Sequence, residues 1–266
     1  MEVFDSCLLV LCLMVAGYFW IQWYYATLSG NELVAKGNYR LPYLLIPAIA
    51  GAALWAVLAN GADPYVRTHF EYFIFYWVGG LTWIILIIWL LPFVGFSPRD
   101  ELERRNIGSV MVVCGAILGL TFAYSGGNVG EGPGSWVVIL CVVVSSIGFF
   151  GVWVLLEGFT QISETVTVER DLAGSVRLTS FLIALGLIMG AAVSGDWIDM
   201  WDFWIAFFAR AWPALVMMMF AVAIEYMGRP SERQPQPSVL LFGVLPSIGY
   251  LIVAVMIFSE QFTRFA

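Results

Sequence analysis

The sequence has very few of the side chains on which soluble enzymes and metal proteins rely. It contains one histidine, His69, and one lysine, Lys36, and only 12% of its residues are charged. A single histidine cannot form a histidine metal cluster or supply both axial ligands of a haem, and the sequence has no HExxH or GxSxG motif. A retinal protein would need a Schiff-base lysine in a late helix, whereas Lys36 lies early in the chain. The sequence therefore predicts no catalytic site, no metal and no cofactor.

Cysteine and positive charge are scarce as well. The four cysteines all fall inside apolar runs and form no CxxC pair, so we expect small buried hydrophobic residues rather than disulfides or metal ligands. The net charge of −7 and the lack of a soluble basic domain argue against binding to nucleic acid. The cysteines are Cys7, Cys12, Cys114 and Cys141.

Long hydrophobic runs are what the sequence has in abundance. Its hydrophobic fraction of 61% exceeds the roughly half that is usual for soluble domains. Runs of about 20 residues are long enough to cross the hydrocarbon core as helices, and lipid tolerates only segments that satisfy their own backbone hydrogen bonds. The first run lacks the positive segment and cleavage site of a signal peptide, so we expect it to be retained. The sequence thus predicts an all-α integral membrane protein with eight transmembrane helices, at Asp5–Leu28, Leu41–Asn60, Phe70–Phe96, Ile107–Ser125, Trp136–Phe159, Gly174–Ser194, Phe203–Met227 and Val239–Phe258.

The basic residues predict the orientation of these helices. Most of them fall in the four loops that join helices one to two, three to four, five to six and seven to eight. The positive-inside rule places these loops in the cytoplasm and both termini outside, with the lipid bilayer as the main surrounding. The loop residues are Lys36, Arg40, Arg99, Arg104, Arg105, Arg170, Arg177, Arg229 and Arg233; Arg67 and Arg264 lie on the other face and Arg210 inside a helix.

The eight helices divide into four helical hairpins of similar pattern, over residues 1–62, 63–131, 132–200 and 201–266. The interval of 68 residues between Asn38 and Asn106 equals that between Glu157 and Glu225. A two-helix unit crosses the membrane an even number of times, so successive copies are parallel repeats rather than inverted ones. Each returning helix is preceded by a residue that favours the N-cap position. These residues are Asn38, Asn106, Asp171 and Ser238.

One stretch resembles a known family. The run from Phe96 to Glu103 leads into Arg105-Asn106-Ile107-Gly108, and Gly37-Asn38 and Asp171-Leu172-Ala173 match it in part. This pattern resembles the repeat of the YjfL-like bacterial inner-membrane family, a group defined by a domain of unknown function. The resemblance implies a bacterial inner-membrane location and a repeat architecture, and it implies no established chemistry.

Two carboxylates at matching helix ends are candidate intramembrane polar residues. Glu157 and Glu225 each lie at the cytoplasmic end of a predicted helix. A charge within the membrane is expensive without a partner or a water-filled path, so such residues indicate functional sites by default. They either bind a cation or relay a proton, or they lie at the headgroup level and pair with loop arginines. The sequence favours the second interpretation.

Arg210 is a sharper candidate, because it lies inside the seventh predicted helix, shortly before the helix-kinking Pro213. One interpretation places it in an internal anion or proton-controlling site, with Asp199, Asp202 or Glu71 as its counter-charge. The other is that Arg210 extends outward to the interface or makes a structural ion pair. The sequence favours the latter by a small margin.

A glycine-rich outer turn, residues 125–135, joins the two halves and contains Glu131. Its carbonyls and this carboxylate suit either a cation site or an entry loop, and a tight connector is the simpler expectation. Glycines at three- or four-residue spacing predict close helix contacts instead of cofactor binding. These are Gly115, Gly119, Gly148, Gly151, Gly186 and Gly190.

Together, these features predict a non-enzymatic, multi-pass inner-membrane protein. We expect a structural or accessory subunit of a membrane assembly, whose contacts are the bilayer and either a membrane-protein partner or a second copy in a homo-oligomer. The alternative is a channel or transporter for ions or small solutes, which the parallel repeats, Arg210 and the acidic residues in or near the outer segments favour. These acidic residues are Glu2, Asp5, Asp63, Glu71, Glu131, Asp196, Asp199, Asp202 and Glu260. A membrane enzyme ranks third because no nucleophile, acid and base form a coherent set.

Overall fold

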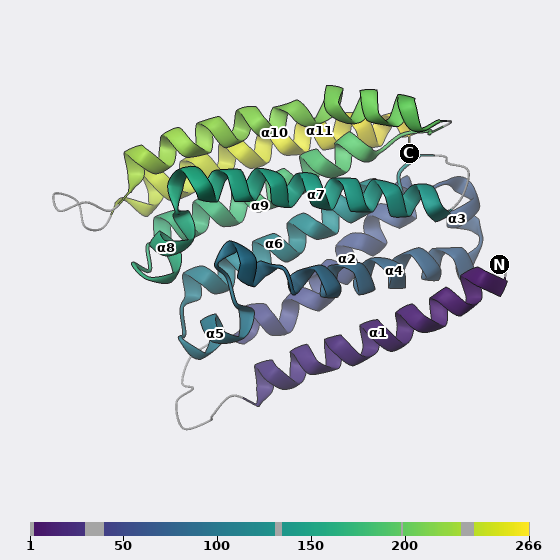
Figure 1. Ribbon diagram of the computed structural model, residues 1–266, viewed down its shortest axis with the longest axis horizontal. Helices are drawn as coiled ribbons and strands as arrows, with labels where there is room; N and C mark the ends of the chain where they lie inside the picture. The colour runs from purple at the N-terminus through teal and green to yellow at the C-terminus, as the bar shows by residue number, and fades with distance from the viewer. Residues whose placement is uncertain (1–2, 30–39, 131–134, 198, 230–236, 266) are drawn as a thin grey trace.

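The computed structural model describes residues 3–29, 40–130, 135–197, 199–229 and 237–265. The helices lie side by side in one elongated bundle, with both described chain ends at the same end of it (Figure 1). Eight segments of the described chain are long and apolar enough to cross a membrane, which confirms the predicted all-α integral membrane protein. Their helices are α1 (Val3–Leu28), α2 (Leu41–Gly61), α4 (Phe70–Ile88), α6 (Ile107–Gly126), α7 (Ser135–Thr160), α9 (Leu172–Val193), α10 (Met200–Gly228) and α11 (Leu245–Phe265), the last continuous with the π-helix η4 (Val239–Val244).

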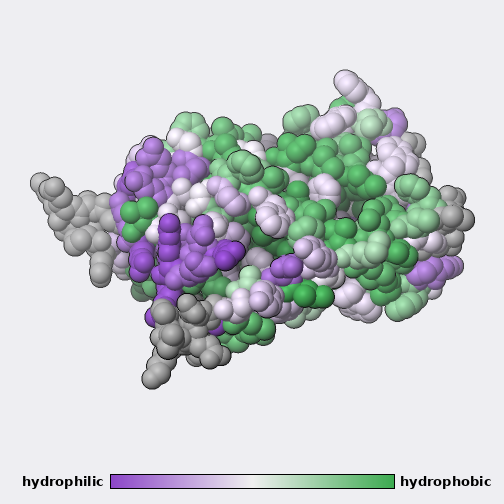
Figure 2. All heavy atoms as spheres, turned by 60° about the horizontal axis from the view of Figure 1, so that its bottom comes forward, coloured by the Kyte–Doolittle hydropathy of each residue, from purple (hydrophilic) through white to green (hydrophobic). Residues whose placement is uncertain are grey.

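Short elements close the two ends of the bundle (Figure 1). The end that carries the described chain termini has α3 (Pro64–Thr68), and the opposite end has α5 (Pro98–Glu103) and α8 (Ile162–Thr167). Hydrophilic side chains gather at the α5 and α8 end, while the flank of the bundle is mainly hydrophobic (Figure 2). This distribution fits a protein whose flank faces lipid.

Three of the predicted N-caps are confirmed. The side chain of Asn106 accepts a hydrogen bond from the backbone N–H of Ser109, and that of Ser238 accepts one from Leu241. Asp171 accepts from the backbone N–H groups of Ala173 and Gly174, at 3.1 and 2.7 Å. The fourth, Asn38, lies outside the described residues. The cap at Asp171 starts α9 at Leu172, two residues before the predicted span.

The third predicted span is too long at its end. Its helix α4 stops at Ile88 instead of Phe96, and the 3-10 helix η3 (Leu91–Val94) follows. Pro92 lacks a backbone N–H, and Gly95 has a left-handed φ of 88°, so this segment cannot continue the helix. The segment is nevertheless apolar, as a transmembrane helix would be, and its Leu91, Val94 and Phe96 side chains are buried in the core.

The core of the bundle is the contact between α6 and α9. Their most apolar windows are 72% and 83% buried, against 11% for α1. Gly119 of α6 faces Gly186 of α9, and a methyl group added to either would overlap with the backbone of the other helix. The predicted contacts of Gly115, Gly119, Gly186 and Gly190 are thus confirmed. The predicted contact of Gly151 is wrong, because this residue faces open space on α7. Spacing alone does not reveal which side of a helix is covered.

Candidate functional site

A buried ion pair joins α9 to α10 near the end of the bundle that carries α8. The guanidinium of Arg177 donates to Oε2 of Glu225 through Nε, at 3.1 Å, and through Nη2. Each side chain is only 2% exposed. Removing two charges from water is unfavourable, so a fully buried ion pair indicates a position with a specific structural or functional role.

The helix ends explain how the two charges meet. Because the Asp171 cap starts α9 at Leu172, Arg177 lies about 7.5 Å along the helix at 1.5 Å per residue. Glu225 lies three residues before the end of α10 at Gly228. Both side chains therefore lie about two turns or less from the same end of the bundle.

The π-helix η4 supplies the third contact of the guanidinium. Its wider i→i+5 turn changes the pattern of backbone hydrogen bonds, and Nη1 of Arg177 donates to the carbonyl of Phe242 inside it. Ser247 strengthens the same junction, since its hydroxyl donates to Gly243 at 2.7 Å and to Val176 at 3.3 Å. The irregular turn is therefore tied directly to the ion pair.

Two polar atoms of this junction have no hydrogen-bond partner among the described residues. They are Oε1 of Glu225 and the hydroxyl of Tyr250 on α11. Both residues are buried. A carboxylate oxygen and a hydroxyl together offer an acceptor and a donor for a proton or a small polar molecule.

The sequence analysis identified Glu225 but expected it at the headgroup level with a loop arginine as partner. The expected pairing is present, because its partner Arg177 is one of the arginines that the sequence analysis assigned to the loops. Glu225 is buried, however, and Arg177 lies within α9. Arg177 and Tyr250 were both missed as site residues. The signal for Arg177 was present: the N-cap at Asp171 places it in the second turn of the helix.

Glu157, the predicted counterpart of Glu225, has a different environment. It is half-buried and accepts hydrogen bonds from the backbone N–H of Ser163, at 3.0 Å, and from the Ser163 hydroxyl. These bonds hold the turn between α7 and α8, where Gln161 has a left-handed φ of 52°. Glu157 is therefore placed as a structural residue.

Arg210 lies far from both carboxylates, fifteen residues from Glu225 along α10, or about 22 Å. Its guanidinium donates to the carbonyl of Ser194 at 2.6 Å and lies 5.6 Å from the centre of the Trp197 ring. None of the ion pairs between described residues includes it. Asp199, one of its expected counter-charges, instead caps α10.

Glu131, the remaining candidate site residue, lies outside the described residues.

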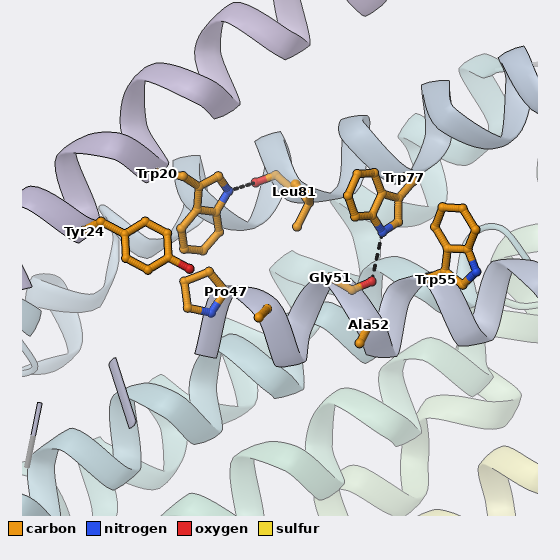
Figure 3. A pocket seen from close by; sticks show the side chains of 9 residues that line it. Trp20, Tyr24, Pro47, Gly51, Ala52, Trp55, Trp77 and Leu81 are labelled. Carbon is orange, nitrogen blue, oxygen red and sulfur yellow. Dashed lines mark hydrogen bonds between the residues drawn. The ribbon is translucent and has the colours of Figure 1, made fainter. Parts of the chain in front are cut away.

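An aromatic groove of about 370 Å³ opens between α1, α2 and α4 (Figure 3). Its indole N–H groups are satisfied, because Trp20 donates to the carbonyl of Leu81 at 3.2 Å and Trp77 to that of Gly51 at 2.9 Å. Tyr24 and Trp55 complete its aromatic wall (Figure 3). The groove offers an apolar surface for lipid and no arrangement of reacting groups.

Comparison with known proteins gives no family: no family model, curated protein or solved structure matches the chain. The chain is a multi-pass helical membrane protein.

Proposed function

We propose that this protein is a structural or accessory subunit of a bacterial inner-membrane assembly, without catalytic activity of its own. The observation that carries the proposal is the glycine-mediated contact of α6 and α9. Because backbone meets backbone along these central helices, the packing of the described residues favours a bundle with a filled centre over one built around an axial path for a solute.

The contacts of the charged side chains support the same proposal. Arg177 and Glu225 bind one another, and Glu157 and Arg210 bind neighbouring backbone groups. In each case the polar side chain fastens one helix or turn to another. Buried polar networks of this kind fix a single packing arrangement more than they lower its free energy.

The proposal includes three further points. They are the resemblance to the YjfL-like family, the inner-membrane location and the orientation with both termini outside. The charge asymmetry supports the orientation, since Arg99, Arg104, Arg105 and Arg170 lie at the α5 and α8 end. The positive-inside rule assigns such an end to the cytoplasm.

Transport is the second candidate, and one observation favours it. Oε1 of Glu225, whose other oxygen binds Arg177, and the Tyr250 hydroxyl are both buried and have no hydrogen-bond partner among the described residues. Carboxylates in such surroundings serve as proton relays in transporters. A proton-coupled solute carrier would use this junction.

The exposed face of α7 gives a sharp test of the assembly proposal. Gly151 and Gly158 lie seven residues apart on this face, and a side chain added at either meets nothing within 4 Å. The double variant Gly151→Leu, Gly158→Leu should therefore fold and insert normally while obstructing a partner helix. Val154→Leu, on the same exposed face, is the matched control.

The measurement is purification in mild detergent with identification of stoichiometric companions, alongside ion flux in proteoliposomes. We expect one companion that travels with the wild type and the Val154→Leu control and is lost from the double glycine variant, with flux equal to that of empty vesicles. Flux above empty vesicles that Glu225→Gln abolishes would favour the transporter. The absence of any stoichiometric companion would contradict the assembly proposal.

A further inference from the structure

A cavity of about 560 Å³ lies at the end of the bundle that carries the described chain termini and α3. It forms where the first turn of α1, the α2–α3 junction and α4 meet the turn after α6 and the start of α7. Its volume falls within the range of about 300 to 1,000 Å³ that is typical of small-molecule sites. It lies far from the Arg177–Glu225 junction, which is at the opposite end of the bundle.

The charge of this cavity is negative. Asp5 and Asp63 line it, and its lining residues within the described part of the chain include no arginine, lysine or histidine. Asp63 also caps α3, since its Oδ1 accepts from the backbone N–H of Tyr65 at 2.6 Å. The three arginines at this end have other contacts. Arg264 pairs with Glu260, and Arg67 donates to the carbonyl of Asn60 at 3.2 Å. Arg210 donates to the carbonyl of Ser194, and its guanidinium lies 5.6 Å from the centre of the Trp197 ring in the cavity wall. The cavity therefore favours a positively charged occupant.

A buried amide lines the same cavity with an unused acceptor. Asn128 is only 7% exposed, and its Nδ2 donates to the carbonyl of Tyr124 at 3.1 Å. Its Oδ1 has no hydrogen-bond partner among the described residues. A buried acceptor without a partner is unfavourable by itself, so this oxygen points to a ligand that brings an N–H or O–H donor.

Aromatic rings form a large part of the remaining wall. Tyr65, Tyr72, Tyr76, Trp136 and Trp197 all line the cavity. The face of an aromatic ring attracts a cation with an energy that rises as water is removed. A hard metal ion would instead need six to eight oxygen ligands, and no group of three or more metal-ligating side chains occurs among the described residues. Rings, two carboxylates and an amide oxygen suit an organic cation better than a metal.

We infer that this cavity binds an organic ammonium group. The carboxylates Asp5 and Asp63 neutralise its charge, and the rings contact its carbon atoms. Asn128 accepts from an N–H of the amine or, in an amino alcohol such as choline, from the hydroxyl. The cavity lies at the ends of the membrane-spanning helices, where both water and lipid headgroups have access. The ammonium group therefore belongs either to a free amine or to the headgroup of phosphatidylethanolamine, and the experiment distinguishes these sources.

The first test measures tryptophan fluorescence of the purified protein during titration with choline and with 3,3-dimethylbutanol, its uncharged analogue of the same shape. Trp136 and Trp197 lie in the cavity wall and report occupancy. We expect a saturable change with choline only. Asp63→Asn should weaken choline binding about tenfold, because the asparagine keeps the cap of α3 and removes the charge. An equal response to the uncharged analogue would overturn the inference.

Glu71→Gln is the matched control, since Glu71 is an exposed carboxylate at the same end that does not line the cavity. Choline affinity should be unchanged in this variant. A loss equal to that of Asp63→Asn would mean that the general negative charge of this end, and not the cavity, attracts the cation. That result would contradict the proposed site.

The second test distinguishes the sources of the ammonium group. Native mass spectrometry of protein from nanodiscs of phosphatidylethanolamine and phosphatidylglycerol should show selective retention of the ethanolamine lipid, lost in Asp63→Asn, if the ligand is a headgroup. Retention of neither lipid together with saturable choline binding assigns a free amine. Retention of both lipids equally in wild type and variant, without choline binding, refutes the site. None of these readouts depends on the proposed assembly role.

Discussion

At the scale of single residues, the buried ion pair stands out because its two halves depend on one another. Arg177 and Glu225 are each 2% exposed, so removal of one partner leaves a charge in the core without compensation. Removal of both leaves only a change of packing. The ion pair can form only when α9 and α10 pack in one register, so it selects that packing over others.

We predict that Arg177→Met lowers the free energy of unfolding by about 3 to 5 kcal/mol, because it strands the carboxylate of Glu225. The double variant Arg177→Met, Glu225→Leu should recover most of this loss. Thermal unfolding in detergent, followed as a double-mutant cycle, measures the coupling.

The control pair is Arg264 and Glu260 on α11, whose side chains are 56% and 64% exposed. The corresponding cycle at this pair should show little coupling, because water screens both charges. Equal coupling at the two pairs, or a double variant no more stable than Arg177→Met, would contradict the role assigned to the buried pair.

Single-residue signals in the sequence are reliable where they act locally. The N-caps at Asn106, Asp171 and Ser238 follow from a side chain and the N–H groups two or three residues away. Glu225 was identified because a carboxylate inside an apolar run is conspicuous. Its partner lies 48 residues away along the chain, and no local pattern encodes that contact.

At the scale of whole elements, glycine spacing predicts contact without revealing which side of a helix is covered. Gly119 and Gly186 face one another across α6 and α9, whereas Gly151 on α7 faces open space. The same uncertainty affected α4, because the apolar run to Phe96 shows no change of composition where Pro92 and Gly95 end the regular helix. The presence of each helix could be predicted from the sequence. Which face of a helix is covered, and where the helix ends, became known only from its tertiary contacts.

We predict opposite effects for alanine at these two kinds of glycine. Gly119→Ala should destabilise the bundle by about 1 to 3 kcal/mol, because the added methyl group forces α6 away from the backbone of α9. Gly151→Ala should be neutral or stabilising by up to about 1 kcal/mol, because alanine favours the helix and meets nothing.

Thermal unfolding monitored by size-exclusion chromatography in detergent compares the two variants directly. Gly148→Ala gives an intermediate case, since its methyl group would meet the flexible side chain of Met189 and not backbone. A Gly119→Ala protein as stable as the wild type would show that α6 and α9 are not in close contact.

At the scale of the whole molecule, lipid constrains the sequence strongly enough that all eight spanning helices could be predicted. Their arrangement could not, because the contacts of α6 with α9 and of α11 with α9 join distant segments. The cavity at the end that carries the described chain termini escaped prediction for the same reason. Asp5, Asp63 and Asn128 meet only after the helices have packed.

The orientation of the bundle is the last prediction, and it decides which compartment the cavity faces. In a variant without the four native cysteines, Thr68→Cys and Glu103→Cys place single thiols on exposed residues at opposite ends. A membrane-impermeant maleimide applied to intact spheroplasts should label Thr68→Cys. Glu103→Cys should react only after permeabilisation, because the positive-inside rule assigns its arginine-rich end to the cytoplasm.

The cysteine-free protein controls for background, and full labelling of both variants after permeabilisation shows that each thiol is accessible. The reverse pattern would contradict the orientation and turn the Asp5–Asp63 cavity toward the cytoplasm. The organic ammonium ligand would then come from the cytoplasm or the inner leaflet, while the carboxylates, the rings and the Asn128 acceptor that favour it would be unchanged.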